Sequence, residues 1–523
     1  LNWVNASANY QAAYGWNTSS LDNRQFGNQI RNNRSVQFNG QLNFGRFYDK
    51  FPSIKELLKP IPKQNLISQE ADSSREEGDA LKVGAQRVGK TIARWVFSIQ
   101  SVNFTYGINQ GTQLAGFVPH VDNFGLDWGF ESDSTGTTST APGAPFVFGQ
   151  QPNLRNSAWL EEKSALGWFT TSQAFTTPFQ QQDSRNFNLR ASMEPIDGLR
   201  IDLTIQKSTS ETFSALWASD SLGDFQLSNR ALQGNMSMSY LSIGSAFENT
   251  TNPQSFGDFE GSFRQTVSER LANENPQLYQ QATDTLGGRL VSNNPSVNGF
   301  FNGFTGSSQD VLIPAFLAAY GPGTAEDVRL SAFPRLPLPN WNANYSGLSE
   351  IDGLKDIFQS VTIRHGYRST YSVSFNLNVN SVAGGAIPEQ ISTETVSLDN
   401  VRGSLQSNPT DSTTVVNVEP VYNINQLSIS EAFAPLIGIN VNFENGIGAQ
   451  LDFNKNRTVV LNVGALQVNE TRNTEFTLNL SWRKERTMKP LQIFGQTINI
   501  RNRITARLET TLRNTDIRNR RLD

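Results

Sequence analysis

The chain has 523 residues, a net charge of −4 and 17% charged residues, against roughly 25% in ordinary soluble domains. The near-neutral balance indicates neither a nucleic-acid-binding tail nor a strongly acidic one, and the absence of cysteine excludes disulfides, thiol catalysis and cysteine metal sites. No apolar run in the sequence approaches the ~20 residues that a membrane-spanning helix needs.

Alternation of apolar and polar residues begins early in the chain, at residues 36–44, and is typical of a strand with one buried face. The same period of two recurs at 102–108, 187–193, 199–205, 361–380, 439–453, 476–482 and 504–512. Residues 361–380 keep it throughout, although strands of globular proteins usually have about 5–6 residues. The sequence therefore predicts many strands, and unusually long ones.

Residues 84–91, GAQRVGKT, match the phosphate-loop pattern, in which glycine amides, a Lys and a hydroxyl hold a nucleotide and Mg²⁺. The neighbouring sequence contradicts that interpretation. Apolar residues from Leu81 to Ile99 recur every three or four positions, as on an amphipathic helix, and an acidic stretch precedes Gly84 where a buried strand is needed. We expect a helical insertion over 50–99, no nucleotide and no cofactor.

The connections between strands are very unequal in length. EPIDG (194–198) and ENG (444–446) are tight turns, whereas helix-like pieces at 262–274 and 309–320 lie within a long connection. The long connections, polar and rich in Gly and Pro, are residues 110–186, 248–340 and 381–430. Short turns on one side and long loops on the other are typical of a membrane barrel.

The strand count between the two tight turns is a difficulty. If both turns lie on one side, an even number of strands must separate them, whereas five can be counted. Either residues 413–420 supply a further strand or one turn lies on the opposite side.

The ENG turn also predicts the register of its hairpin: Phe443 should oppose Ile447 across a three-residue loop, with Gly446 in the left-handed conformation.

Two architectures contain many such strands. The polar face of a soluble sandwich meets bulk water, whereas the polar face of a membrane barrel lines a lumen, and aromatic residues gather at the two membrane interfaces. Aromatic residues near strand ends and inner faces rich in Asn, Ser, Thr and Arg favour the second. We predict the all-β class: a transmembrane antiparallel β-barrel with helical and irregular loop insertions. A soluble, secreted β-rich binding protein is the alternative that extraction without detergent would indicate.

The sequence offers no convergent acid, base, nucleophile or metal-ligand set, so we expect no enzyme, no catalytic residue and no metal site. The alternation in 361–380 places odd residues toward lipid and even residues toward the lumen. Lumen-facing candidates are Arg190, Arg200, Asp202, Arg364, Arg368, Asn376 and Asn378. Lipid- or interface-facing candidates are Tyr367, Tyr371, Phe375, Leu377, Phe443, Leu451, Phe453 and Trp482. An ordinary solvated strand face is the alternative for the arginines.

Six segments resemble one family. They are APGAPFVFG (141–149), NLRASMEPIDGLRIDL (188–203), QDVLIPAFLAAYG (309–321), PLPNWNANYSGLSEI (337–351), RHGYRSTYSV (364–373) and LSISEAFAPLIGINV (427–441). In these segments, and in their order and spacing, the chain resembles the SprA/Sov family of outer-membrane translocons of the type IX secretion system. The likeness extends over essentially the whole chain.

The resemblance implies a very large barrel, of which residues 1–523 are an internal section, in the outer membrane of a Gram-negative bacterium of the Bacteroidetes type. The implied function is a protein-conducting channel that passes folded cargo to the cell surface and is associated with gliding motility. Its implied partners are secreted cargo proteins, a partner barrel protein, a plug protein and the lipid bilayer, without nucleic acid. The long connection around 248–335 is then a candidate cap or gate. The alternative is a receptor-type outer-membrane transporter for small nutrients.

Overall fold

The computed structural model describes residues 2–52, 97–121, 123–126, 142–249, 251–274, 299–301, 303–351, 353–377, 401–407, 414–487, 491–493, 496–498 and 501–522. The GAQRVGKT segment and the helix expected around it lie outside these residues, as do Asn378 and the last three positions of the strand expected at 361–380.

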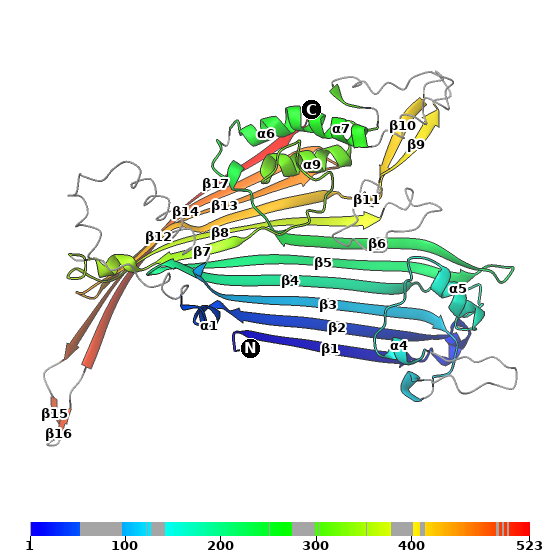
Figure 1. Ribbon diagram of the computed structural model, residues 1–523, viewed down its shortest axis with the longest axis horizontal. Coiled ribbons are helices and arrows are strands. Elements are labelled where there is room, and N and C mark those ends of the chain that lie inside the picture. The colour runs from blue at the N-terminus through cyan, green and yellow to red at the C-terminus, as the bar shows by residue number, and fades with distance from the viewer. Residues whose placement is uncertain are drawn as a thin grey trace.

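One antiparallel sheet of 13 strands organises the chain (Figure 1). Its strands are β1 (Val4–Asn17), β2 (Asn28–Asn43), β3 (Ile99–Phe117), β4 (Phe179–Ile196), β5 (Leu199–Ser219), β6 (Phe225–Ser239), β7 (Asn340–Tyr345), β8 (Phe358–Leu377), β11 (Tyr422–Asn423), β12 (Gln426–Phe443), β13 (Ile447–Asn462), β14 (Gln467–Thr487) and β17 (Arg501–Arg521). Strands β1 and β17 lie at its two margins. The predicted all-β, antiparallel class is confirmed.

Strands β6 and β7 together occupy a single position between β5 and β8. Strand β6 pairs with the half of β5 that ends at Ser219, and β7 pairs with the half that begins at Leu199. Both also pair with β8. Four positions therefore separate the EPIDG and ENG turns, which lie at the same end of the sheet. The count of five was wrong because one strand is interrupted by an insertion.

The strand suggested at 413–420 exists but does not join the main sheet. Strand β10 (Thr414–Pro420) pairs with β9 (Val401–Ser407) in a separate two-stranded ribbon, as β15 (Leu491–Ile493) does with β16 (Gln496–Ile498). The connection expected at 381–430 thus contains a hairpin, and β12 already begins at Gln426.

Helices occur mainly in two connections, one at the end of the sheet opposite the tight turns and one that leaves the sheet midway along β5 (Figure 1). We call residues 118–178 the first insertion and residues 240–339 the second insertion. The first contains α4 (Ala144–Val147) and α5 (Ala158–Ala165); the second contains α6 (Gln254–Asp258), a π-helical turn (Phe259–Phe263), α7 (Arg264–Glu274) and α9 (Gln309–Tyr320). A short helix, α1 (Phe44–Tyr48), follows β2.

Helices α7 and α9 confirm the pieces predicted at 262–274 and 309–320. The loop expected at 110–186 is shorter than predicted, because β3 continues to Phe117 and β4 starts at Phe179. Within the described part of the chain, no helix has the length and apolar character required to cross a bilayer.

The register keeps apolar residues on one face from strand to strand, because residues paired directly across two strands project to the same side. Ile363 opposes Ile439, which opposes Leu451, which in turn opposes Leu478. Their chain neighbours, such as Asn440, are polar and project to the other side. We call these two sides the apolar face and the polar face.

The two insertions cover the half of the apolar face that is farther from the tight turns. Helix α9 is buried along nearly its whole length, which suits a helix that is apolar all round. Beneath it, Tyr371 of β8 is fully buried and donates a hydrogen bond to the Ala332 carbonyl oxygen at 2.7 Å. In the first insertion Trp168 packs on Phe117, and Phe179 packs on Phe213, all within the same connected core.

The predicted ENG turn is confirmed. Asn442 pairs with Gly448, so Phe443 and Ile447 flank a three-residue loop, and the Gly446 amide donates to the Phe443 carbonyl at 3.1 Å. Gly446 has φ = +83°, in the left-handed region that glycine adopts most readily.

Replacing Gly446 by Ala should destabilise this hairpin by at least about 1–2 kcal/mol, because the left-handed conformation is strained for alanine. The new Cβ would also lie 2.3 Å from the Arg483 carbonyl oxygen. The urea midpoint of the purified protein measures the effect. Gly464→Ala is the matched control, since a Cβ there meets nothing within 4 Å. Equal midpoint shifts in the two variants would contradict the assignment.

Candidate functional site: an anchoring charge cluster and a bare apolar band

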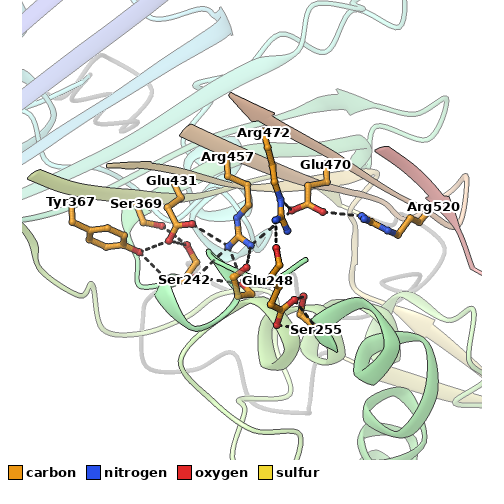
Figure 2. Close-up of polar contacts among 11 residues, drawn as sticks. Ser242, Glu248, Ser255, Tyr367, Ser369, Glu431, Arg457, Glu470, Arg472 and Arg520 are labelled. Atoms are coloured by element: carbon orange, nitrogen blue, oxygen red, sulfur yellow. Dashed lines mark hydrogen bonds and ion pairs between the residues drawn. The ribbon is translucent and has the colours of Figure 1, made fainter. Parts of the chain in front are cut away.

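Five charged side chains from neighbouring strands meet on the apolar face, under the second insertion (Figure 2). They are Glu431 of β12, Arg457 of β13, Glu470 and Arg472 of β14 and Arg520 of β17. The register brings them together: Glu431 opposes Arg457, which opposes Arg472. The side chains of Glu431, Arg457 and Glu470 are no more than 2% exposed.

These side chains form a connected set of ion pairs. Arg457 Nη2 lies 3.2 Å from Glu431 Oε2, and its Nη1 lies 3.9 Å from Glu470 Oε1. Glu470 is also paired with Arg472 Nε at 2.6 Å and with Arg520 Nη1 at 2.8 Å. Three guanidinium groups thus share two carboxylates, which leaves an excess of positive charge in a buried place.

Backbone oxygens of the second insertion take up that excess. Arg457 donates to the carbonyl oxygens of Ser245 at 2.5 Å and Ser242 at 3.2 Å. Arg472 donates to the Glu248 carbonyl oxygen at 2.5 Å. A buried charge is tolerated only when it is paired and hydrogen-bonded, so residues 242–248 are held where these carbonyls meet the guanidinium groups.

The Glu431 carboxylate fixes the same segment from the other side. Its Oε1 accepts from Ser242 Oγ at 2.9 Å and from the Tyr367 hydroxyl at 2.8 Å, while Ser242 Oγ lies 3.1 Å from Ser369 Oγ (Figure 2). The Tyr367 hydroxyl in turn accepts from the Ser242 amide at 2.9 Å. The start of the second insertion is therefore bonded to β8, β12 and β13 together.

Two further contacts connect the cluster to the helices. The Glu248 carboxylate accepts from Ser255 Oγ at 2.6 Å at the start of α6. Tyr320, the last residue of α9, is buried, and burial, followed by the nearby charge of Glu470, raises the pKa of its hydroxyl. At the first residues of α9, burial raises the pKa of Asp310 to about 6. The helices and the cluster thus form one packed unit.

The first insertion is held by a smaller version of the same arrangement. Arg155 Nη2 lies 2.6 Å from Glu211 Oε2 of β5, and both side chains are buried. Asn32 of β2 donates to the carbonyl oxygens of Phe146 and Gln150, each at 2.9 Å. A buried ion pair and side-chain bonds to loop carbonyls hold both insertions on the apolar face.

The arrangement suits anchoring better than chemistry. The charged groups of the cluster face one another or backbone carbonyls, so none is aimed into an open pocket where a substrate could bind. Across the described residues, no group of three or more His, Cys, Asp or Glu side chains could hold a metal ion. The cluster stabilises the attachment of the second insertion to the sheet.

The half of the apolar face nearer the tight turns carries a different surface, which we call the bare band. Its residues are uncharged on every strand and mostly large and apolar, and no described helix or sheet covers them. Its members include Phe38, Leu42, Phe104, Leu189, Ile201, Leu203, Ile363, Ile439, Val441, Leu451, Phe453, Phe476, Leu478, Leu480, Leu508 and Leu512. Leu508 is 59% exposed and Leu512 67% exposed.

The sequence-predicted lumen candidates all lie on the polar face, except Asn378, which is outside the described residues. Arg364 pairs with Asp452 at 2.7 Å, and Arg200 pairs with its neighbour Asp202 at 3.1 Å. The side chains of Arg190, Arg368 and Asn376 are exposed. Shallow hollows lie along this face, lined by Asn, Gln, Ser and Thr side chains. That these residues face a lumen stays a prediction.

Four of the lipid-facing candidates need correction. Tyr367, Tyr371, Phe375 and Leu377 have the predicted parity, but all four are buried. The second insertion and the adjoining residues 421–424 pack over this half of β8, so these side chains contact protein and cannot face lipid. Phe443, Leu451, Phe453 and Trp482 lie on the uncovered half, and their lipid contact stays a prediction.

Sequence reasoning missed the charge cluster altogether. The available signal was a charged residue at an apolar position of an alternating strand. Glu431 falls between Ile429 and Phe433 on the apolar side, and Arg457 falls two residues before Val459. An ionisable group on a buried face is costly unless it is paired, so such a position predicts a partner.

Comparisons with known proteins add little. No protein-family model matches the sequence, and neither does any curated protein. Among solved structures, the chain is weakly similar to the outer membrane transporter YddB from Escherichia coli, with 6% sequence identity and a TM-score of 0.16. The match covers 98% of this chain and 60% of the length of that one. A likeness this low carries no argument, so the inferences below rest on the residues of this chain.

Replacing Arg457 by Gln should loosen the second insertion, because it leaves Glu431 buried without its ion-pair partner, a loss of about 3–5 kcal/mol. Limited proteolysis should then cut within 240–339 while the strands stay resistant. Arg368→Gln is the matched control, because Arg368 is at the same height on the opposite face and is exposed. Unchanged resistance of the Arg457 variant would show that the cluster does not anchor the insertion.

Proposed function

We propose that the chain forms part of the wall of an outer-membrane β-barrel. The observation that carries the proposal is the bare band: an uncharged, largely apolar strip that crosses every strand position of the sheet and is left uncovered by the described elements. The opposite face of the same strands is polar. Apolar residues toward lipid and polar residues toward a lumen are the arrangement of a transmembrane barrel.

The dimensions agree with a membrane. The band has about four apolar-face residues on each long strand, for example Leu199 to Ile205 of β5, which extends roughly 20 Å at ~3.4 Å per residue. A tilted strand that spans a membrane needs about 9–11 residues, which puts about five on each face. Strands β5, β14 and β17 have 21 residues each, about twice the 9–11 needed for crossing. Half of each strand therefore projects beyond the membrane, and the insertions cover that half.

A soluble sandwich fits the structure less well. Its apolar face would be covered by a second sheet along its whole length, as in other two-layer β-folds. Here the described elements cover only one half of the apolar face. A face that is half covered and half bare suits contact of the bare half with a membrane.

The polar face supports passage rather than tight binding. Asn, Gln, Ser and Thr hydrogen-bond to water, and its described charges, such as Arg364 with Asp452, are partly paired. A conduit works best when its wall is wetted and holds passing molecules weakly.

We further propose that the barrel conducts proteins as a translocon of the type IX secretion system, in an outer membrane of the Bacteroidetes type. The support is the sequence resemblance to the SprA/Sov family. Its quoted segments include residues 309–321, which contain helix α9, and the parts of β8 and β12 that bear Tyr367, Ser369 and Glu431. The family's pattern thus coincides with the anchored insertion. On this proposal the partners are secreted cargo, a partner barrel protein and a plug protein. A receptor-type transporter for small nutrients is the second candidate.

Thiol labelling in intact cells tests the membrane wall, because the chain has no cysteine of its own. Single cysteines at Phe476, Leu478 and Leu480 should be protected from a membrane-impermeant maleimide. Cysteines at Thr477, Asn479 and Ser481, on the polar face, should react. Strand β14 serves better than the far half of β8, where the insertion hides the apolar face in any case. Equal labelling of both sets would exclude the barrel.

Photo-cross-linking separates protein conduction from nutrient uptake. A benzophenone amino acid at Asn376, exposed on the polar face, should capture secreted proteins in transit, because cargo passes along this surface. The same group at Leu478, on the bare band, should capture none. Absence of cargo adducts at Asn376 in actively secreting cells would favour the small-nutrient transporter.

A further inference from the structure

The two insertions lie on the apolar face, which is also the face of the bare band. If the band meets lipid, as proposed above, the insertions lie outside the barrel wall and not within its lumen. This placement argues against the expectation that the 248–335 region caps or gates the pore, since a gate has to reach the polar face. The question is what the insertions contact where they border the membrane.

A row of rings marks the border between the bare band and the second insertion. Trp341 of β7 stacks on Tyr367 of β8, with ring centroids 4.5 Å apart, and Tyr367 lies 5.0 Å from Phe433 of β12. Phe247 of the insertion continues the row, 5.2 Å from Phe433. Tyr367 and Phe433 are buried, whereas Phe247 at the end of the row is 57% exposed, at the kind of border where transmembrane barrels carry interfacial aromatic residues.

Cations border the bare band on four strands. Arg34, Arg185, Lys207 and Lys455 each lie two residues beyond the last band residue of their strands: Val36, Phe187, Ile205 and Phe453. Lys455 Nζ lies 4.2 Å from the ring centre of Phe247, and Lys207 donates to the Arg335 carbonyl oxygen at 2.9 Å. Positive side chains at the edge of an apolar strip lie where the phosphates of a bilayer would be.

The insertions themselves expose apolar side chains along the border of the bare band. Phe247 is 57% exposed although its ring contacts Phe433 and Lys455. Leu336 is 78% exposed and follows directly on Arg335, whose carbonyl is bound by Lys207 at the edge of the band. In the first insertion, Phe148 is also exposed, and its neighbour Gly149 packs against Arg34. Both insertions therefore present an apolar fringe to the border of the band.

We propose that the two insertions form an external collar. The edge of this collar nearest the bare band, at Phe148, Phe247 and Leu336, lies in the lipid–water interface. The occupant of this surface is the headgroup layer of the bilayer that surrounds the band. Three features along the border of the bare band support it: the ring row that ends in the exposed Phe247, the neighbouring cations and the exposed fringe. The proposal rests on the membrane wall proposed above and adds a second zone of lipid contact to it.

The collar explains why the charge cluster has to hold the second insertion firmly on the sheet. An apolar fringe in the interface is pulled toward lipid whenever the wall moves relative to the bilayer, and the buried ion pairs of Glu431, Arg457 and Glu470 resist its separation from the sheet. Outside the wall, the insertions leave the polar face open for passage.

Nitroxide depth measurements on the protein in phospholipid vesicles test the collar. Single cysteines at Phe247 and Leu336 are spin-labelled, and the ratio of collision rates with oxygen and with nickel-EDDA reports depth. Leu508 of the band is the lipid control, and Leu222 is the aqueous control, because it is 85% exposed in the β5–β6 turn, roughly 50 Å along the strand from the band at ~3.4 Å per residue. Labels at Phe247 and Leu336 should give ratios between those of the two controls, with several-fold less nickel contact than Leu222.

Two other outcomes are distinguishable. If Leu508 reports lipid while Phe247 and Leu336 match Leu222, the collar is overturned and the barrel wall stands. If Leu508 also matches Leu222, the membrane wall itself fails. Leu336 is in a loop and largely exposed, so its label leaves the packing intact and keeps the test valid even if the Phe247 variant folds poorly.

Discussion

The structure depends on one geometric constraint: successive side chains of a strand project to opposite faces, and paired strands keep those faces in phase. A slip of one residue in the β8–β12 pair would move Arg364 to the side of the band and Ile363 to the polar side. The one-residue shifts, such as those at Asn28/Gln29, Ser214/Leu216 and Asn442/Phe443, lie toward strand ends, and between them the registers keep one phase, even across the irregularity between Phe433 and Gly438. That phase gives the sheet two chemically distinct sides.

A second division, along the strands and not across them, determines what each half of the apolar face contacts. From Lys207 and Lys455 outward, the apolar face is polar or charged for a few residues and then apolar again beneath the insertions. The covered half is a protein core, in which burial of Tyr371 and helix α9 supplies the stabilisation. The half that the described elements leave uncovered is a larger apolar surface than soluble proteins usually expose, which is the reason for proposing a membrane as its partner.

The buried charges belong to the boundary between these halves. Desolvation of Glu431 and Arg457 is costly, and replacement of such groups by apolar residues is often neutral for stability. Their contribution here is to fix the position of the insertion. Hydrogen bonds to the carbonyls of Ser242 and Ser245 allow one position, whereas packing of rings and leucines alone would define it less narrowly.

The sequence by itself determined the strands, their faces and one turn, because those features depend on period and on local backbone preference. The alternation around Phe375, the Gly446 turn and helix α9 could each be read from a few consecutive residues. The sequence could not show that β6 and β7 share one sheet position, since 100 residues separate Ser239 from Asn340. Only pairing with β5 and β8 brings the two strands together. Nor could it show that Tyr371 is covered by protein while Leu451 is bare, because the same alternation suits a face packed on helices and a face packed on lipid. The tertiary structure decided which apolar residues other described elements cover, and it brought Glu431, Arg457 and Glu470 together from three strands whose spacing in sequence carries no sign of their contact.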